Sequence, residues 1–298
     1  MRVAKPILAV LALGALVLAG AWTAGWFFAR PINHAVPPPD PPGRVVHLIA
    51  SDGVRIEGSY WPGATEDGPA VLLLHGINAS REMFDAHARW LNGLGYAVLA
   101  IDFRGQGGSD AVVRTFGWSE TRDARAALDF LRRRHPDRRI GVIGVSMGGA
   151  AALMGEEGPL PVEAMVLQAV YPDLRTAVAN RTNRAGSPAL TFFAEPLLSY
   201  QSWPRYGVWP EVISPIGRLA HYRGEVLVIG GGSDLSTLPV DTVAMYRAAP
   251  GRKALWLVDG ASHVETSKLW SEPYRHRVRC LFARTLGEPR PAPTPACG

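Results

Sequence analysis

The chain has 298 residues, of which 47% are hydrophobic and 19% charged, and its net charge is +5. This composition is typical of a globular protein with one substantial core and excludes a disordered or collagen-like chain. Much of the positive charge lies in residues 131–139, LRRRHPDRR, at the end of a predicted helix. Because no aromatic side chains are interleaved with these arginines, we expect no nucleic-acid partner.

The first 30 residues form a separate apolar segment. Arg2 and Lys5 precede an uncharged run at 7–28, and at about 1.5 Å per residue a helix of that length crosses a bilayer. The basic end stays in the cytoplasm, so we expect a single-pass anchor with the rest of the chain extracytoplasmic. The alternative is a cleaved signal peptide, because the AGA triplet at 19–21 fits a cleavage site, and the protein is then secreted or periplasmic.

Two proline-rich segments flank the predicted main domain, residues 44–286. Residues 31–43, PINHAVPPPDPPG, favour an extended linker that contributes nothing to a core. Residues 287–298 are similarly broken by proline and are expected to be a disordered tail. An oxidising compartment would allow Cys280 and Cys297 to pair, but the sequence does not decide whether they do.

The main domain begins with a predicted hairpin and continues with alternating strands and helices. Two apolar runs flank Asp52-Gly53, a strong tight-turn signal. Later strands are predicted at 69–76, 96–105, 138–146, 162–170, 224–234 and 253–263. Runs that are apolar at nearly every position suit strands covered on both faces, and the helical patterns between them imply parallel crossovers. We therefore predict an α/β fold with a mostly parallel sheet flanked by helices.

One connection, residues 171–222, is too long for a simple crossover. It carries several aromatic residues among prolines. A long insertion in a compact domain is usually a lid or a binding loop, and we expect a lid here. The same aromatic residues would also serve to pack the insertion onto the domain.

The string GVIGVSMGGA at 141–150 holds a single serine, Ser146, between Gly144 and Gly148. A buried strand precedes the serine and a helix of small residues follows it, which is the context of a nucleophile elbow. Side chains at the two glycines would clash in such a turn. The helix that follows offers the Met147 N–H to a developing negative oxygen.

A serine hydroxyl needs a base and an orienting acid. His263 follows the last long strand on a Gly-containing loop and is the predicted base, and Asp234, at the end of the preceding strand, is the predicted acid. Asp173 and Asp259 are the alternatives for the acid. His75 is better placed to shape the turn that supplies the Ile77 N–H as the second oxyanion donor.

These stretches resemble the α/β-hydrolase superfamily, in the branch of serine aminopeptidase-like and monoacylglycerol-lipase-like proteins. The matching strings are LLLHG, DFRGQGGSD, GVSMGGA, GGSD and DGASH, in this order. The resemblance implies Ser146 as nucleophile, Asp234 and His263 as its partners, and Ile77 with Met147 as the oxyanion hole. Val145 and the string HGINAS depart from some members, so the resemblance assigns no substrate.

The sequence thus predicts a serine hydrolase that cleaves carboxylic esters, with apolar acyl groups favoured by the aromatic insertion and the neighbouring membrane. Its partners are a small-molecule ester and the membrane, and no pattern indicates an oligomeric state. No nucleotide-binding glycine motif or metal-ligand spacing occurs, so we expect no cofactor and no metal. A peptidase or thioesterase with the same triad, and a catalytically silent binding protein, remain alternatives.

Overall fold

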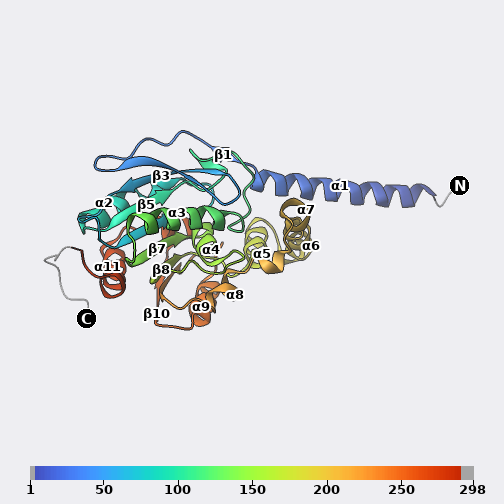
Figure 1. Ribbon diagram of the computed structural model, residues 1–298. Coiled ribbons are helices and arrows are strands. Elements are labelled where there is room, and N and C mark those ends of the chain that lie inside the picture. Colours follow the sequence, from blue (N-terminus) through green and yellow to red (C-terminus); the bar gives the residue numbers. More distant parts are fainter. Residues whose placement is uncertain (1–3, 290–298) are drawn as a thin grey trace.

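The computed structural model describes residues 4–289 and contains an eight-stranded sheet between two layers of helices (Figure 1). In spatial order the strands are β10 (Lys253–Val258), β9 (Glu225–Gly231), β8 (Ala164–Gln168), β7 (Ile140–Val145), β4 (Ala70–Leu74), β5 (Ala97–Ile101), β3 (Arg55–Trp61) and β2 (Arg44–Ile49). β2 and β3 form the predicted hairpin, β3 is antiparallel to β5, and the other neighbours are parallel. The predicted mostly parallel sheet is confirmed.

The central strands explain where functional groups gather. Every residue of β4, β5, β7 and β8 is buried, as expected for strands covered on both faces. Parallel strands bring their carboxyl ends to one edge of the sheet, and side chains that follow several strands meet there. The segments after β4, β7, β8, β9 and β10 all lie at this edge.

Helices cover both faces of the sheet through two separate apolar clusters. One face packs against α2 (Asp85–Gly93), which continues a 3₁₀ turn at Arg81–Phe84, and α11 (Glu272–Leu286). The other face packs against α3 (Glu120–Arg134), α4 (Met147–Leu153), α8 (Pro215–Leu219) and α9 (Pro239–Ala248). The short helix α10 (His263–Ser267) follows β10.

The insertion at 171–222 is helical. It consists of α5 (Leu174–Ala185), α6 (Pro188–Ser199), α7 (Ser202–Tyr206), a 3₁₀ turn at Pro210–Val212, and α8. The side chain of Asp173 caps α5 by accepting from the Thr176 N–H at 2.8 Å, and Ser187 caps α6. In Figure 1, α5, α6 and α7 lie beside the base of the N-terminal helix.

The N-terminal helix α1 (Ala4–Ala29) projects from the domain as one unbroken element (Figure 1). Residues Ile7–Ala29 are long and apolar enough to cross a membrane, and their most apolar window is 0% buried. The extended linker expected at residues 31–43 is attached to the domain at its start, because β1 (Ile32–Asn33) pairs in parallel with β6 (Gln106–Gly107). The Asn33 amide also donates to the carbonyl oxygen of Ser109 at 2.5 Å. Cys297 and residues 290–298 of the expected tail lie outside the described residues.

His87 in α2 is buried among the rings of Phe84, Trp270 and Tyr274. Its neutral ring donates from Nε2 to the carbonyl oxygen of Leu269 at 3.1 Å. Burial disfavours the charged imidazolium and lowers the pKa of His87 from 6.5 to about 4.

The pKa of His87 predicts a loss of stability in acid. As the pH falls from about 6.5 to about 4, the unfolded chain takes up this proton before the folded chain does, so the free energy of unfolding decreases. We expect His87→Gln, which keeps a donor for Leu269, to reduce this decrease by about 3 kcal/mol. Denaturant unfolding of the full chain in detergent across this pH range measures the effect, with the surface variant His221→Gln as control. Equal pH dependence in all three proteins would contradict the assignment.

Candidate active site

The predicted nucleophile, Ser146, occupies a sharp turn between β7 and α4. Its backbone has φ 50° and ψ −114°, a region that residues other than glycine rarely adopt. A Cβ on Gly144 would lie 2.5 Å from the Cα of Gly149, and a Cβ on Gly148 would lie 2.6 Å from the carbonyl oxygen of His75. The strand, turn and helix predicted around Ser146 are present, and both glycines are needed for them to pack.

His263 and Asp234 meet at the carboxyl edge of the sheet. His263 Nδ1 lies 2.7 Å from Asp234 Oδ2, and the aspartate side chain is completely buried. The other carboxylate oxygen accepts from the main-chain N–H groups of Ser236 and Thr237 at 2.7 and 2.9 Å. A carboxylate held by three donors keeps Nδ1 protonated, which leaves Nε2 of the imidazole as the free basic atom.

The alternative acids are engaged elsewhere or exposed. Asp173 caps α5, and its second oxygen accepts from the Thr176 hydroxyl at 2.8 Å. Asp259 is exposed after β10, and within residues 4–289 no hydrogen bond or ion pair is recorded for it. Of the three candidate acids, the structure brings Asp234 to His263.

Gln168, the last residue of β8, connects the serine turn to the histidine helix. Its carbonyl oxygen accepts from the Ser146 N–H at 2.8 Å, and its side-chain Nε2 donates to the carbonyl oxygen of Thr266 in α10. Because His263 is the first residue of α10, one residue fixes the backbone on both sides of the site. In the described part of the chain, no hydrogen bond joins the Ser146 hydroxyl to His263 itself.

A second loop reaches the serine from β4. Gly76 lies beside Ser146, since a Cβ on this glycine would be 3.5 Å from the serine Cβ. His75 is completely buried, and desolvation lowers its pKa, so the ring is neutral. Its Nδ1–H donates to the Gly76 carbonyl oxygen at 2.7 Å, and its Nε2 accepts from the Phe103 N–H at 3.0 Å. His75 therefore shapes this loop, as predicted from the sequence.

The predicted oxyanion donors, Ile77 and Met147, both line the cavity that contains Ser146. Between residues 4 and 289, no hydrogen bond is recorded for either main-chain N–H. Asn78, the next residue, has φ 60°, and its N–H donates to the side-chain oxygen of Gln106 at 2.7 Å. Two amide N–H groups that make no hydrogen bond within the described residues thus flank the serine.

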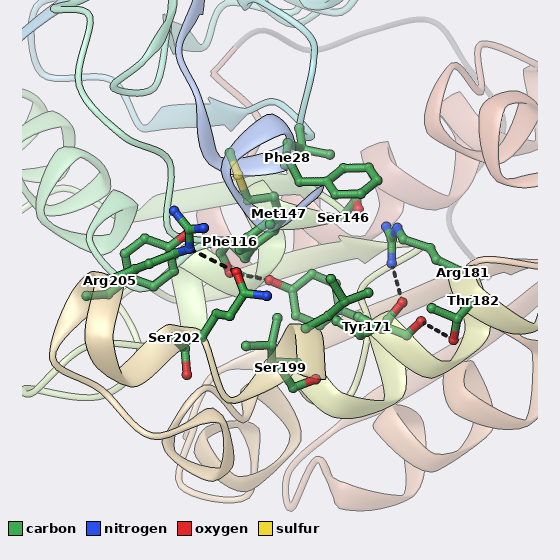
Figure 2. Close-up of a pocket in the computed structure, with 18 of the residues that line it drawn as sticks. Phe28, Phe116, Ser146, Met147, Tyr171, Arg181, Thr182, Ser199, Ser202 and Arg205 are labelled. Carbon is green, nitrogen blue, oxygen red and sulfur yellow. Dashed lines mark hydrogen bonds between the residues drawn. The ribbon is translucent and has the colours of Figure 1, made fainter. Parts of the chain in front are cut away.

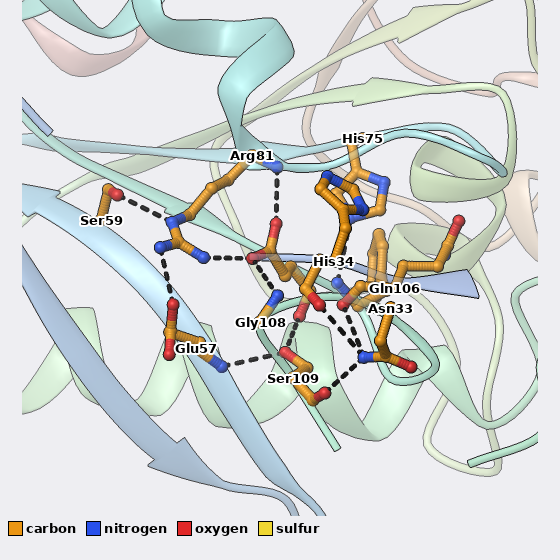
Figure 3. Close-up of polar contacts among 12 residues, drawn as sticks. Asn33, His34, Glu57, Ser59, His75, Arg81, Gln106, Gly108 and Ser109 are labelled. Carbon is orange, nitrogen blue, oxygen red and sulfur yellow. Dashed lines mark hydrogen bonds and ion pairs between the residues drawn. The ribbon is translucent and has the colours of Figure 1, made fainter. Parts of the chain in front are cut away.

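A buried polar network around Asp102 and Arg81 lies next to the segment that carries Ile77 and Asn78 (Figure 3). Asp102 accepts from the Arg81 N–H at 2.6 Å, from the Gly108 N–H at 2.9 Å and from the Arg81 guanidinium. The same guanidinium donates to Glu57 at 2.7 Å and to Ser59 at 2.9 Å. Asp102 thus organises its own loop, as expected from the sequence.

The cavity beside Ser146 has a volume of about 340 Å³ and is mostly apolar. Figure 2 shows Ser146 and Met147 at one side, with Tyr171, Thr182 and Ser199 facing them from the insertion. Its lining includes side chains of α5, α6 and α7 and two residues of α1, Gly25 and Phe28. Arg181 of α5 also lines it and donates to the Ala177 carbonyl oxygen at 2.8 Å, and no ion pair of Arg181 occurs within residues 4–289.

Gly25 and Phe28 are site residues that the sequence analysis missed. A uniformly apolar helix gives no periodic signal for the face that contacts protein. The available signal was the spacing of Ala21, Gly25 and Ala29, since small residues four apart allow close helix packing.

The remaining histidines have structural partners or lie outside the site. His135 Nε2 is 3.0 Å from the Tyr60 hydroxyl, and His87 is packed beneath α2. No group of His, Cys, Asp or Glu that could hold a metal ion occurs within the part of the chain that the structure describes.

Comparisons with known proteins agree with this architecture. Residues 66–202 match the model of a family described as serine aminopeptidase, S33. An uncharacterized protein of Mycobacterium tuberculosis is 31% identical over 289 residues, which cover 93% of this chain and 95% of that protein. The monoglyceride lipase of Mus musculus is 32% identical over 125 residues, 41% of each chain.

A solved structure shows the same fold. An esterase of Pyrococcus furiosus superposes with a TM-score of 0.69 and 24% identity, and the match covers 87% of this chain and all of that esterase. The strand order, the elbow at Ser146 and these relatives lead to one assignment. The chain belongs to the α/β-hydrolase superfamily.

Proposed function

We propose that this protein is a serine hydrolase that cleaves carboxylic esters with apolar acyl groups through an acyl-enzyme intermediate. The observation that carries the proposal is the 2.7 Å contact between His263 Nδ1 and the buried Asp234, at the sheet edge where Ser146 projects from its strained turn. Homology to a lipase and the fold shared with an esterase support the reaction class.

In the proposed reaction His263 acts first as a base and then as an acid in each of the two halves, acylation and deacylation. His263 Nε2 takes the Ser146 hydroxyl proton as the serine oxygen attacks the ester carbonyl carbon. The Ile77 and Met147 N–H groups hold the resulting oxyanion. His263 then gives the proton to the departing alcohol. In the second half a water molecule gives a proton to the same imidazole and attacks the acyl-serine carbonyl carbon, and the imidazole returns that proton to the Ser146 oxygen as the acid is released.

The cavity supports an ester over an N-terminal peptide as substrate. Recognition of a free peptide N-terminus needs a carboxylate to pair with its ammonium group. The described residues that line the cavity include Arg181 and Arg205 but no aspartate or glutamate. A largely apolar cavity of about 340 Å³ is suited to an acyl chain. A thioester of the same acyl group would fit equally.

The proposed location is the outer face of a membrane. The apolar length of α1 supports a single span, and the basic residues Arg2 and Lys5 at its start favour a cytoplasmic N-terminus. The hydrolase domain would then be extracytoplasmic, with the helices α5 to α7 acting as a lid next to the membrane surface.

Ser146→Ala tests the nucleophile. We expect this change to lower kcat for a p-nitrophenyl ester by about 10⁶-fold, because no other group would form the acyl-enzyme. The thermal unfolding midpoint should change little, since the hydroxyl makes no hydrogen bond that the described structure records. Turnover that survives in the folded variant would refute the assignment.

Asp234→Asn tests the orienting acid. An amide cannot stabilise the imidazolium and presents the wrong hydrogen-bond pattern to Nδ1, so kcat should fall by about 10⁴-fold. Asp259→Asn removes the same charge from a nearby exposed position and should leave kcat unchanged. Steady-state kinetics of both variants decide between the two carboxylates, and a larger loss for Asp259→Asn would reverse the assignment.

A further inference from the structure

The last two turns of α1 are part of the cavity wall. Gly25 and Phe28 line the same cavity as Ser146. Figure 2 shows the Phe28 ring next to Ser146 and Met147. The end of α1 therefore forms part of the cavity wall, in addition to connecting the domain to the apolar segment.

Polar contacts hold α1 against the insertion. The Gln201 amide donates to the Ala21 carbonyl oxygen at 2.8 Å, and the Arg205 guanidinium donates to the Trp22 carbonyl oxygen at 2.5 Å and lies 3.8 Å from the Trp22 ring centroid. A Cβ on Gly25 would come within 2.9 Å of the Gln201 side-chain carbon Cδ, so a larger residue at position 25 would displace the amide that bonds to Ala21.

The end of α1 is also fixed to the loop that carries Ile77. The buried guanidinium of Arg114 donates to the carbonyl oxygens of Phe28 and Arg30 at 2.7 and 2.9 Å, and to the side-chain oxygen of Asn78 at 2.5 Å. One side chain thus joins the helix end to the residue that follows Ile77. The parallel pairing of β1 with β6 continues this attachment.

The length of α1 and its aromatic residues indicate where the cavity would lie relative to a membrane. At about 1.5 Å per residue, Ile7–Ala29 is long enough to span the hydrocarbon core. The exposed rings of Trp22, Trp26 and Phe27 then lie at the outer interface, where aromatic side chains are favoured. The rings of Phe192 and Phe193 on α6 are also exposed.

We propose that α1 is retained in the mature protein and completes the acyl-binding cavity, with Phe28 as a specificity-determining residue that contacts the acyl chain. The inference rests on the proposed ester hydrolysis. The substrate class that fits is an ester with one long acyl chain dissolved in the outer leaflet, whose chain would lie in the apolar cavity that Phe28 and the insertion form beside Ser146.

The test compares two neighbouring phenylalanines in the full chain reconstituted in phosphatidylcholine vesicles. Phe27 and Phe28 are 55% and 53% exposed, but of the two it is Phe28 that lines the cavity. The probes are p-nitrophenyl laurate, which dissolves in the bilayer, and p-nitrophenyl acetate, which does not fill an acyl pocket. The measured quantity is the ratio of kcat/KM for laurate to kcat/KM for acetate.

We expect Phe28→Ala to lower this ratio about tenfold, through loss of apolar contact with the long chain, while Phe27→Ala leaves it unchanged. Phe28→Leu, which keeps an apolar side chain, should restore most of the ratio. The intact mass of the protein from the membrane fraction should equal that of a chain that still contains residues 1–21.

The contrary outcomes separate the two proposals. Equal ratios for Phe28→Ala, Phe27→Ala and the wild type, or a mature mass that lacks residues 1–21, would overturn the role of α1 and leave ester hydrolysis intact. No turnover of either ester by the wild type would overturn the proposed function itself.

Discussion

The backbone at Ser146 is the constraint on which the site depends. A serine with φ 50° and ψ −114° is strained, and the turn persists because the surrounding structure holds it. Gly144 and Gly148 allow β4, β7 and α4 to approach closely enough to do so. The Ser146 N–H is tied to the carbonyl oxygen of Gln168 at the end of the neighbouring strand β8. Three adjacent strands at the centre of the sheet, β4, β7 and β8, therefore contact the turn and hold it in place.

The two residues proposed as partners of the serine depend on the same parallel strand order. Asp234 follows β9 and His263 follows β10, so their side chains reach the edge from which Ser146 projects. Burying the Asp234 carboxylate would be costly without donors, and two main-chain N–H groups and the imidazole supply them. Gln168 adds a direct link from β8 to the helix that begins at His263.

Sequence reasoning predicted the features that local patterns encode. The fully apolar runs, the Asp52-Gly53 turn and the glycines around Ser146 indicated the strands, the hairpin and the elbow. The choice of Asp234 over Asp173 followed from chain order, and the hydrogen bond to His263 agrees with it. The contact of α1 with the insertion was not predictable in this way, because the sequence of an all-apolar helix has no pattern that distinguishes the face in contact with protein. The pairing of Ile32–Asn33 with β6 is likewise a tertiary contact, in a segment whose prolines indicated only an extended chain.

The central claim is that Ser146 is an activated nucleophile, and covalent labelling tests it most directly. The full chain would be treated with a fluorophosphonate, digested and analysed by mass spectrometry. The account predicts one adduct per chain, located on Ser146, and a much slower reaction in Asp234→Asn. An unlabelled folded protein, or an adduct on another residue, would contradict it.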